Sequence, residues 1–393
     1  MAGLNETPKG DRVHIAFFGL RNAGKSTLVN RLTGQDVAIV SDVAGTTTDP
    51  VSKAMEILPL GPCLVTDTAG LDDEGQLGEM RVKKSLDVLA TTDIAVWVED
   101  GTLGRTRSPS GPNGGRLGEA ALPVYTRFLE ACRARDIAVL HYRRGDDVEA
   151  FRRELAAVRL VDAPRPLVGD LVSTGDVVAC VCPIDESAPK GRLILPQQQV
   201  VRELLDAGAS ALVCQPSQLA DLLARTAGVK FVITDSQAFK AVAAVVPPEI
   251  PLTSFSIVFA RAKGDLAAYC AGAAALAALK DGDRVLISEG CTHHRQCNDI
   301  GTVKLPKWIM AKTGKKLSFE WTSGNAFPED LSPYALVVHC GGCMLTRRAV
   351  QARIARCRAA GVPITNYGVC IAACNGITAS PDTCMVRRLG VGL

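Results

Sequence analysis

Two groups of residues, near opposite ends of the 393-residue chain, have types and spacing suited to chemistry. Near the start, the segment Gly19–Ser26 reads Gly-Leu-Arg-Asn-Ala-Gly-Lys-Ser and matches the phosphate-loop pattern GxxxxGKS. Near the end, the segments Cys291–His293 and His339–Cys343 place thiols and imidazoles, which are metal ligands, at short spacings. A phosphate loop alone indicates an NTPase, and a Cys/His set alone indicates a metal site. Together they predict nucleotide hydrolysis coupled to the handling of a metal cluster.

The segments around the phosphate loop support its assignment. Val13–Phe18 predicts an apolar strand, and Thr27–Leu32 predicts a helix. In this context backbone N–H groups of the loop surround phosphates, and the helix N-terminus adds its positive dipole end. We expect Lys25 to reach the β- and γ-phosphates and the Ser26 hydroxyl to bind Mg²⁺. The other residues expected at the nucleotide are Asn22, Ala23, Gly24 and Thr27.

Two further segments resemble the switches of GTPases. Asp67-Thr-Ala-Gly70 resembles the second Mg²⁺-sensing motif, in which Asp67 would hold the ion through water and the Gly70 N–H would sense the γ-phosphate. Ser41–Asp49 resembles the first switch of the group that includes tRNA-modification and ribosome-assembly GTPases, with Thr47 closing on Mg²⁺. The catalytic residues implied are therefore Lys25, Thr47 and Gly70.

Asn22 carries a further implication of the same resemblance. Members of that group with Asn at this position take K⁺ beside the phosphates, which implies K⁺ activation here. Asn also tolerates left-handed backbone, so a purely conformational role is the alternative.

The base-recognition end of the domain departs from the GTPase pattern. The strand predicted over Ile137–Leu140 should end in Asn-Lys-x-Asp, whose Asp reads the guanine edge, but it continues as His141-Tyr-Arg-Arg-Gly-Asp146. The stretch between Asp146 and Pro164 is too short for the last strand and helix of a full domain. Triphosphate binding is therefore predicted more firmly than selection of guanine.

Composition excludes several classes of protein. Lys and Arg total 44 against 41 Asp and Glu, a net charge of +3, so we expect neither nucleic-acid nor membrane binding. Residues 1–12 lack the apolar core of a signal peptide, and we expect a cytoplasmic protein. Fourteen cysteines then indicate metal ligands and buried small hydrophobes rather than disulfides. The seven expected to be ordinary buried residues are Cys63, Cys132, Cys180, Cys182, Cys214, Cys270 and Cys357.

The fold class predicted is α/β: a P-loop GTPase-like domain at 1–163, followed by two further α/β domains with mainly parallel sheets, at 164–262 and 263–393. In the middle domain, assigned to dimerisation, helices are predicted over Gln197–Leu205 and Gln218–Ala224. Its predicted strands are Asp176–Ile184, Ala211–Cys214, Phe231–Thr234 and Ser254–Phe259. The apolar segment Leu266–Leu279 predicts a buried helix.

Three predicted strands of the last domain end beside cysteines. These strands are Arg284–Ser288, Ala335–Val338 and Pro363–Asn366. In a parallel sheet their carboxyl ends emerge at one edge, where open α/β folds build their sites. This convergence predicts one metal site made from Cys291, Cys340 and Cys343.

The residues alone leave the metal open. Three thiolates and an exchangeable fourth position suit an iron–sulfur cluster. Three thiolates with His293 or His339 would equally make a tetrahedral zinc site, and Cys340-Gly-Gly-Cys343 also fits a redox dithiol.

The chain resembles the HydF maturation GTPases of iron–iron hydrogenases over nearly its whole length. Besides the loop and the Cys/His pair, the resemblance rests on Thr7–Arg12, Asp42–Asp49, Asp67–Gly75, Val82–Lys84, Val168–Leu171, Pro183–Asp185, Pro189–Pro196, Asp299–Gly301 and Pro363–Gly368. It implies a 4Fe–4S cluster on Cys291, Cys340 and Cys343, with His293 and His339 lining or completing the fourth position.

The same resemblance implies a function and partners. Such proteins are homodimeric scaffolds or carriers that bind GTP with Mg²⁺, accept a diiron precursor from radical-SAM maturases and pass it to the apo-hydrogenase. The alternative from another class is a zinc-dependent oxidoreductase or hydrolase with an appended NTPase domain.

Overall fold

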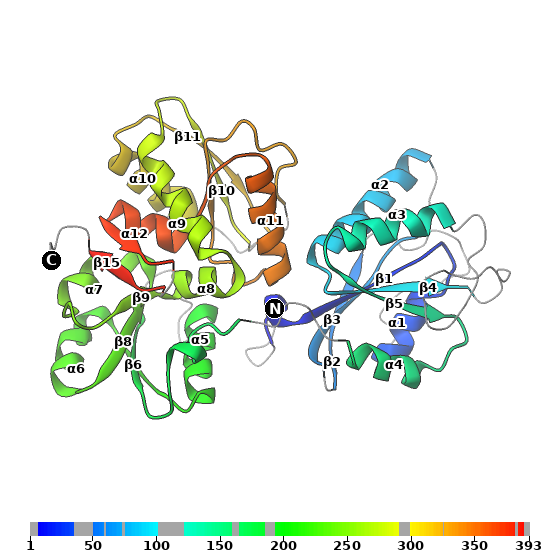
Figure 1. Ribbon diagram of the computed structural model, residues 1–393, viewed down its shortest axis with the longest axis horizontal. Coiled ribbons are helices and arrows are strands. Elements are labelled where there is room, and N and C mark those ends of the chain that lie inside the picture. Colours follow the sequence, from blue (N-terminus) through cyan, green and yellow to red (C-terminus); the bar gives the residue numbers. More distant parts are fainter. Residues whose placement is uncertain are drawn as a thin grey trace. The chain divides into compact units, whose positions relative to one another are not determined.

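The computed structural model describes residues 7–34, 50–58, 60–72, 75–100, 122–158, 165–184, 193–290, 299–324, 326–381 and 384–388. The chain divides into two compact units, Met1–Ala163 and Pro164–Leu393 (Figure 1).

The first unit is built on a five-stranded sheet with the order β2-β3-β1-β4-β5. The strands are β1 (Val13–Phe18), β2 (Val51–Ile57), β3 (Gly61–Asp67), β4 (Ile94–Glu99) and β5 (Ala138–Arg143). β2 is antiparallel to β3, and the other neighbours are parallel. β1 and β4 lie inside the sheet and are buried on both faces, which is why they are almost continuously apolar.

Helices cover both faces of this sheet. Alternate residues of β1 point to opposite faces: Ile15 and Phe17 join the core under α1 and α4, whereas Ala16 and Phe18 pack against α3 (Figure 1). The helices are α1 (Lys25–Thr33), α2 (Gly75–Asp87), α3 (Leu122–Arg133) and α4 (Val148–Ala156). In the described part of this unit the sheet stops at β5, as the short C-terminal stretch of the domain predicts.

The second unit contains a six-stranded sheet with the order β14-β15-β9-β8-β6-β7. Its strands are β6 (Val177–Val181), β7 (Ser210–Cys214), β8 (Val229–Thr234), β9 (Leu252–Ser254), β14 (Ile377–Ala379) and β15 (Val386–Arg388). β6 to β9 are parallel, and β14 and β15 are antiparallel additions. The helices between the parallel strands are α5 (Leu195–Asp206), α6 (Leu219–Arg225) and α7 (Phe239–Val245).

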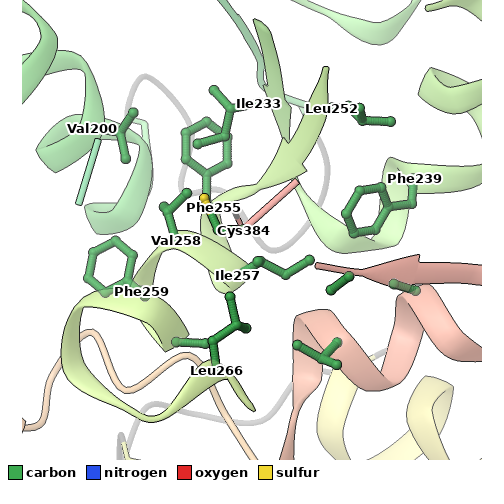
Figure 2. Packing of buried hydrophobic residues seen from close by; sticks show 14 of the residues in the cluster. Val200, Ile233, Phe239, Leu252, Phe255, Ile257, Val258, Phe259, Leu266 and Cys384 are labelled. Carbon is green, nitrogen blue, oxygen red and sulfur yellow. The ribbon is translucent and has the colours of Figure 1, made fainter. Parts of the chain in front are cut away.

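The strand predicted over Ser254–Phe259 is wrong. β9 ends at Ser254, and helix α8 runs over Phe255–Lys263. The Ser254 hydroxyl caps the helix by accepting a hydrogen bond from the backbone N–H of Ile257 at 3.2 Å. A short, mostly apolar segment such as this one fits a buried helix and a buried strand equally well. Figure 2 shows Phe255, Val258 and Phe259 of this helix within the core.

A four-stranded, wholly parallel sheet with the order β11-β10-β12-β13 completes the second unit. The strands are β10 (Arg284–Ser288), β11 (Ser318–Thr322), β12 (Leu336–His339) and β13 (Ile364–Asn366), and the helices are α9 (Leu266–Ala274), α10 (Leu305–Thr313), α11 (Arg347–Ala359) and α12 (Tyr367–Cys374). The α/β class with mainly parallel sheets is therefore confirmed.

One hydrophobic core extends through both sheets of the second unit. Phe255 and Val258 of α8 belong to the same buried cluster as Leu286 of β10 and Val337 of β12. The chain also returns at its end, because Val386 of β15 pairs with Leu252 of β9. The segments 164–262 and 263–393 thus share a sheet and a core.

Candidate functional site

The phosphate loop joins β1 to α1 through backbone that few side chains allow. Gly19 has φ +151°, and a Cβ there would lie 2.4 Å from the carbonyl oxygen of Val98. Asn22 has φ 59° and Gly24 has φ 94°, both in the left-handed region. The strand, loop and helix predicted around Gly19–Ser26 are confirmed.

Lys25 lies buried across this loop. Its ammonium donates to the carbonyl oxygen of Leu20 at 2.7 Å and to that of Gly19 at 3.2 Å. The loop carbonyls therefore hold the cation at the centre of the turn, where an incoming phosphate would meet it.

Ser26 and Asp67, both predicted to hold Mg²⁺, are in contact at the end of the phosphate loop. The Ser26 hydroxyl donates to Asp67 Oδ2 at 2.5 Å. Asp67 Oδ1 is buried and has no hydrogen-bond partner among the described residues. Burial raises the pKa of the Asp67 carboxyl, while the Ser26 hydrogen bond and the Lys25 charge oppose that rise. A hydroxyl and an unpartnered carboxylate oxygen at the end of a phosphate loop fit Mg²⁺.

The segment after Asp67 crosses the phosphate loop closely. Asp72 Oδ1 accepts a hydrogen bond from the backbone N–H of Arg21 at 2.6 Å, and the two side chains approach to 3.7 Å. A Cβ on Gly70 would lie 2.5 Å from Arg21 Cγ and 2.9 Å from Arg21 N, so only glycine fits. The sequence analysis did not predict the contact between Asp72 and Arg21. The only signal available for it was the acidic residue type of Asp72, two positions after Gly70.

At the base-recognition end, the two aspartates that closely follow β5 both accept hydrogen bonds from nearby backbone N–H groups. Asp146 Oδ2 accepts the backbone N–H of Arg143 at 2.9 Å, and Asp147 Oδ1 caps α4 by accepting the N–H of Glu149 at 3.0 Å. Both carboxylates therefore serve local turns. Arg144 lies against the phosphate loop instead: a Cβ on Gly24 would be 3.6 Å from Arg144 Cδ.

The strand ends predicted to converge do so. β10 lies beside β12, and β12 lies beside β13, with Ser288, His339 and Asn366 in register across the sheet. The residues that follow these strands therefore leave from one edge. Cys291 and His293, predicted at the metal site, and Thr47, predicted as a switch residue, lie outside the described residues. Within the part of the chain that is described, no group of three metal-compatible side chains comes together.

Cys340 sits in a cradle of backbone donors. Its Sγ accepts hydrogen bonds from the N–H of Gly290 at 3.0 Å and of Gly342 at 3.4 Å. Burial raises the pKa of the Cys340 thiol, while these N–H groups and the charge of Arg353 lower it. Donors aimed at sulfur stabilise a thiolate, which is the form that binds metal.

Glycine at position 290 and an anchored loop keep this cradle in place. A Cβ on Gly290 would lie 2.7 Å from Leu345 Cγ. The Lys263 ammonium donates to the carbonyl oxygens of Cys343 at 3.3 Å and Leu345 at 3.0 Å. The loop carrying both cysteines is thus fixed from two sides, and its donor set fits a thiolate-bound cluster.

His339 is buried directly behind Cys340. Its Nδ1 lies 2.7 Å from the carbonyl oxygen of Cys340, and its Nε2 lies 3.0 Å from Arg353 Nη1. Burial and the neighbouring guanidinium lower the pKa of the His339 imidazole to about 3, so the ring is neutral.

A half-buried polar pair lies at the same sheet edge. The Tyr367 hydroxyl donates to Glu289 Oε1 at 3.2 Å. Burial and the Glu289 charge raise the pKa of the Tyr367 phenol well above its usual value. Sequence reasoning missed Glu289, Tyr367 and Arg353; the place of Glu289 directly after a predicted strand was a signal, whereas the helical position of Arg353 gave none.

Of the seven cysteines predicted to be ordinary buried residues, all but Cys270 are buried. Six are buried, and Cys270 is half-buried. Burial raises the pKa of the Cys180, Cys182 and Cys357 thiols to about 12, which leaves them unreactive. No helix in the described residues combines the length and apolar character that a membrane crossing requires.

Comparison with known families decides the affiliation of the chain. Residues 167–264 match the hydrogen maturase F dimerization domain, and residues 267–380 match the hydrogen maturase F tetramerization domain. The chain belongs to the HydF hydrogenase maturase family. Residues 14–114 match the 50S ribosome-binding GTPase family, so the N-terminal unit of this HydF-family chain carries a GTPase domain.

Curated GTPases match part of the chain. The chain is 42% identical over 105 residues to the tRNA modification GTPase MnmE of Paramagnetospirillum magneticum, covering 25% of this chain and 24% of that protein. It is 44% identical over 150 residues to the GTPase Der of Xylella fastidiosa, covering 37% and 29%. The chain thus spans less than a third of the length of these relatives.

Among solved structures, Era of Aquifex aeolicus bound to GDP and AlF4⁻ is 16% identical, covering 80% of this chain and 94% of that one, with a TM-score of 0.27.

Proposed function

We propose that this HydF-family chain is a scaffold or carrier in the maturation of iron–iron hydrogenase, binding a 4Fe–4S cluster and a diiron precursor. The observation that carries the proposal is the cradle of backbone donors around Cys340 Sγ, at the edge where β10, β12 and β13 end together. This cradle lies in the region that matches a hydrogen maturase domain.

In this proposal Cys291, Cys340 and Cys343 hold the cluster. A bound cluster supplies an iron with an exchangeable position, at which a precursor can dock. The chain's own residues fix the cysteine loop and donate hydrogen bonds to sulfur.

The GTPase domain would time the exchange of partners. We infer that Lys25 binds the phosphates and that Ser26 and Asp67 bind Mg²⁺. The hydrogen bonds of Lys25 to the loop carbonyl and of Ser26 to Asp67, and the unpartnered Oδ1 of Asp67, support this inference. Thr47 and Gly70 are proposed as the switch residues that sense the γ-phosphate, and Asn22 as a K⁺ ligand. Such loops order around the γ-phosphate and relax on hydrolysis, which gives the carrier two states.

The proposed partners follow from the family. The matched domains are named for dimerization and tetramerization, which supports an oligomer, and we infer a homodimer as its basic form. The diiron precursor would arrive from radical-SAM maturases and leave with the apo-hydrogenase.

The first experiment is anaerobic iron, sulfide and zinc analysis with an absorption spectrum, on the wild type and Cys340→Ala. About four irons and four sulfides per chain, lost in the variant, are expected. Cys270→Ala, which removes a half-buried cysteine elsewhere, is the matched control and should retain the cluster. One zinc and no sulfide would overturn the proposal in favour of a zinc-dependent oxidoreductase or hydrolase.

A second experiment tests the coupling to nucleotide. The affinity for apo-hydrogenase is measured with and without GTP, for the wild type and Lys25→Ala. GTP should change the affinity of the wild type alone. Equal affinities in all samples would mean that the chain acts as a scaffold without control by nucleotide.

A further inference from the structure

A buried arginine lies behind the proposed cluster site. Arg353 of α11 is 5% exposed and packs its guanidinium over the Phe327 ring, with its Cζ 5.2 Å from the centroid. Its Nη1 donates to Ser288 Oγ at 3.1 Å and approaches His339 Nε2 to 3.0 Å, and its Nη2 donates to the carbonyl oxygen of Gly324 at 2.6 Å. Arg353 is therefore held in one position by three polar partners and a ring.

This arrangement fixes the tautomer of His339. A guanidinium has donors only, so the His339 Nε2 must accept the hydrogen bond from Arg353. The proton of the neutral imidazole then resides on Nδ1, which donates to the carbonyl oxygen of Cys340 at 2.7 Å. One ring nitrogen has its lone pair in a hydrogen bond, and the other carries the proton.

The same carbonyl receives a second donor from the neighbouring strand. Asn366 Nδ2 lies 3.4 Å from the Cys340 carbonyl oxygen, and Asn366 Oδ1 caps α12 by accepting the N–H of Gly368 at 2.8 Å. Two donors from β12 and β13 therefore hold the peptide that carries Cys340. The orientation of this peptide in turn sets where Cys340 Sγ meets its backbone donors.

We propose that His339 is not an iron ligand but the centre of a brace, Arg353–His339–Cys340, in which Arg353 acts as a positioning residue for the cysteine loop. A nitrogen ligand needs a free lone pair, and the brace leaves none on His339. Arg353 also places a buried positive charge near the sulfur of Cys340, which favours an anionic cluster in its more reduced state. The part concerning the cluster rests on the proposed function, whereas the tautomer does not.

The tautomer is tested on the full chain without metal. Histidines are labelled with ¹⁵N, and the signal absent from His339→Asn assigns His339 among the five histidines. A protonated Nδ1 and an accepting Nε2 are expected. A protonated Nε2, or rapid exchange between tautomers, would overturn the brace.

The ligand question is tested on the loaded protein. Pulsed EPR of the reduced cluster, with ¹⁴N- and ¹⁵N-histidine, is compared between the wild type and His339→Asn. We expect the wild type and His339→Asn to show the same nitrogen couplings to the cluster. A strong coupling present in the wild type and lost in His339→Asn would show that His339 binds iron. Iron and sulfide analysis of the same samples reports on the proposed function separately, so a failure to bind a cluster is not confused with a failure of the brace.

Arg353→Met is compared with Arg356→Met as a matched control. Arg356 lies on the same helix and also packs over Phe327, with its Cζ 5.1 Å from the centroid, but it donates to the carbonyl oxygen of Pro328 instead. Arg353→Met should allow His339 to exchange between its two tautomers and should lower the reduction potential of the cluster. Arg356→Met should leave the tautomer and the potential unchanged. Equal behaviour of the two variants would overturn the role of Arg353.

Discussion

At the scale of single residues, the nucleotide site holds a carboxylate that burial disfavours. Because burial raises the pKa of Asp67, the folded chain binds a proton at this position more readily than the unfolded chain does. At a pH above the ordinary pKa of an aspartate, ionised Asp67 therefore lowers the free energy of unfolding. This destabilisation disappears as the pH falls below that ordinary pKa, because the carboxyl is then protonated in both states.

We predict that Asp67→Asn is more stable than the wild type at pH 7 without nucleotide, by about 1 kcal/mol. The variant should also lose Mg²⁺-dependent nucleotide binding, by about tenfold or more. Urea unfolding at pH 7 and at lower pH measures the first effect, and the difference between the proteins should shrink as the pH falls. A variant less stable than the wild type at pH 7 would contradict the role given to burial.

The residues that follow β5, where GTPases recognise guanine, make local contacts in this chain. Asp146 and Asp147 are engaged in a turn and a helix cap, and Arg144 lies beside Gly24. A polar site that pairs with one base edge rejects analogues by about 10⁴-fold. We expect this chain to prefer GTP over ATP by about tenfold or less, equivalent to ~1.4 kcal/mol. Competition between the two nucleotides for the Mg²⁺-loaded protein measures the ratio, and a thousandfold preference would show that another group reads the base.

At the scale of elements, a helix approaches a strand of the four-stranded sheet with no room for a side chain. A Cβ on Gly272 of α9 would lie 1.9 Å from the carbonyl oxygen of Ile364 in β13. β13 ends at Asn366, which holds the Cys340 peptide, so this contact also sets the cysteine loop.

We predict that Gly272→Ala destabilises the second unit by about 2–3 kcal/mol, although alanine favours helices in isolation. Ala271→Ser, at the exposed neighbouring position, is the control and should change stability by less than about 0.5 kcal/mol. Calorimetric unfolding measures both. A stabilised Gly272→Ala would mean that α9 can move away from β13.

How far the sequence predicts such elements depends on what sets each boundary. The strand at Arg284–Ser288 is predicted with the bounds it has, because polar and glycine residues flank an apolar run. The run at Ser254–Phe259 misleads because it is buried all round, and a single serine cap decides where the strand becomes a helix. Arg353 cannot be singled out from the sequence, because its role depends on the packing of α11 over His339.

At the scale of the whole molecule, the second unit has a buried cluster that extends through both of the segments that the sequence predicts as separate domains. Residues of α8, β10 and β12 share a buried cluster, and Thr253 Oγ1 donates to the carbonyl oxygen of Cys384 at 2.6 Å. Composition and periodicity describe each segment by itself, so they cannot show that a late segment completes an earlier sheet.

We therefore predict that a fragment covering residues 164–393 unfolds in one cooperative transition, whereas residues 164–264 alone do not fold stably. The shorter fragment would expose apolar surface that the longer one buries. Calorimetry and binding of a hydrophobic dye distinguish the two. A soluble, cooperatively folding 164–264 fragment would show that the shared core is dispensable.

The pairing of β15 with β9 also sets the order in which the sheet can form during biosynthesis. The six-stranded sheet receives Val386–Arg388 after all of its parallel strands have been synthesised. Translation proceeds at about 5–20 residues per second, so the earlier strands wait several seconds for the segment that completes their sheet. The sheet and its shared core are therefore completed only once this late segment has left the ribosome. Loading of the proposed cluster into a fully formed unit would then follow the emergence of this late segment.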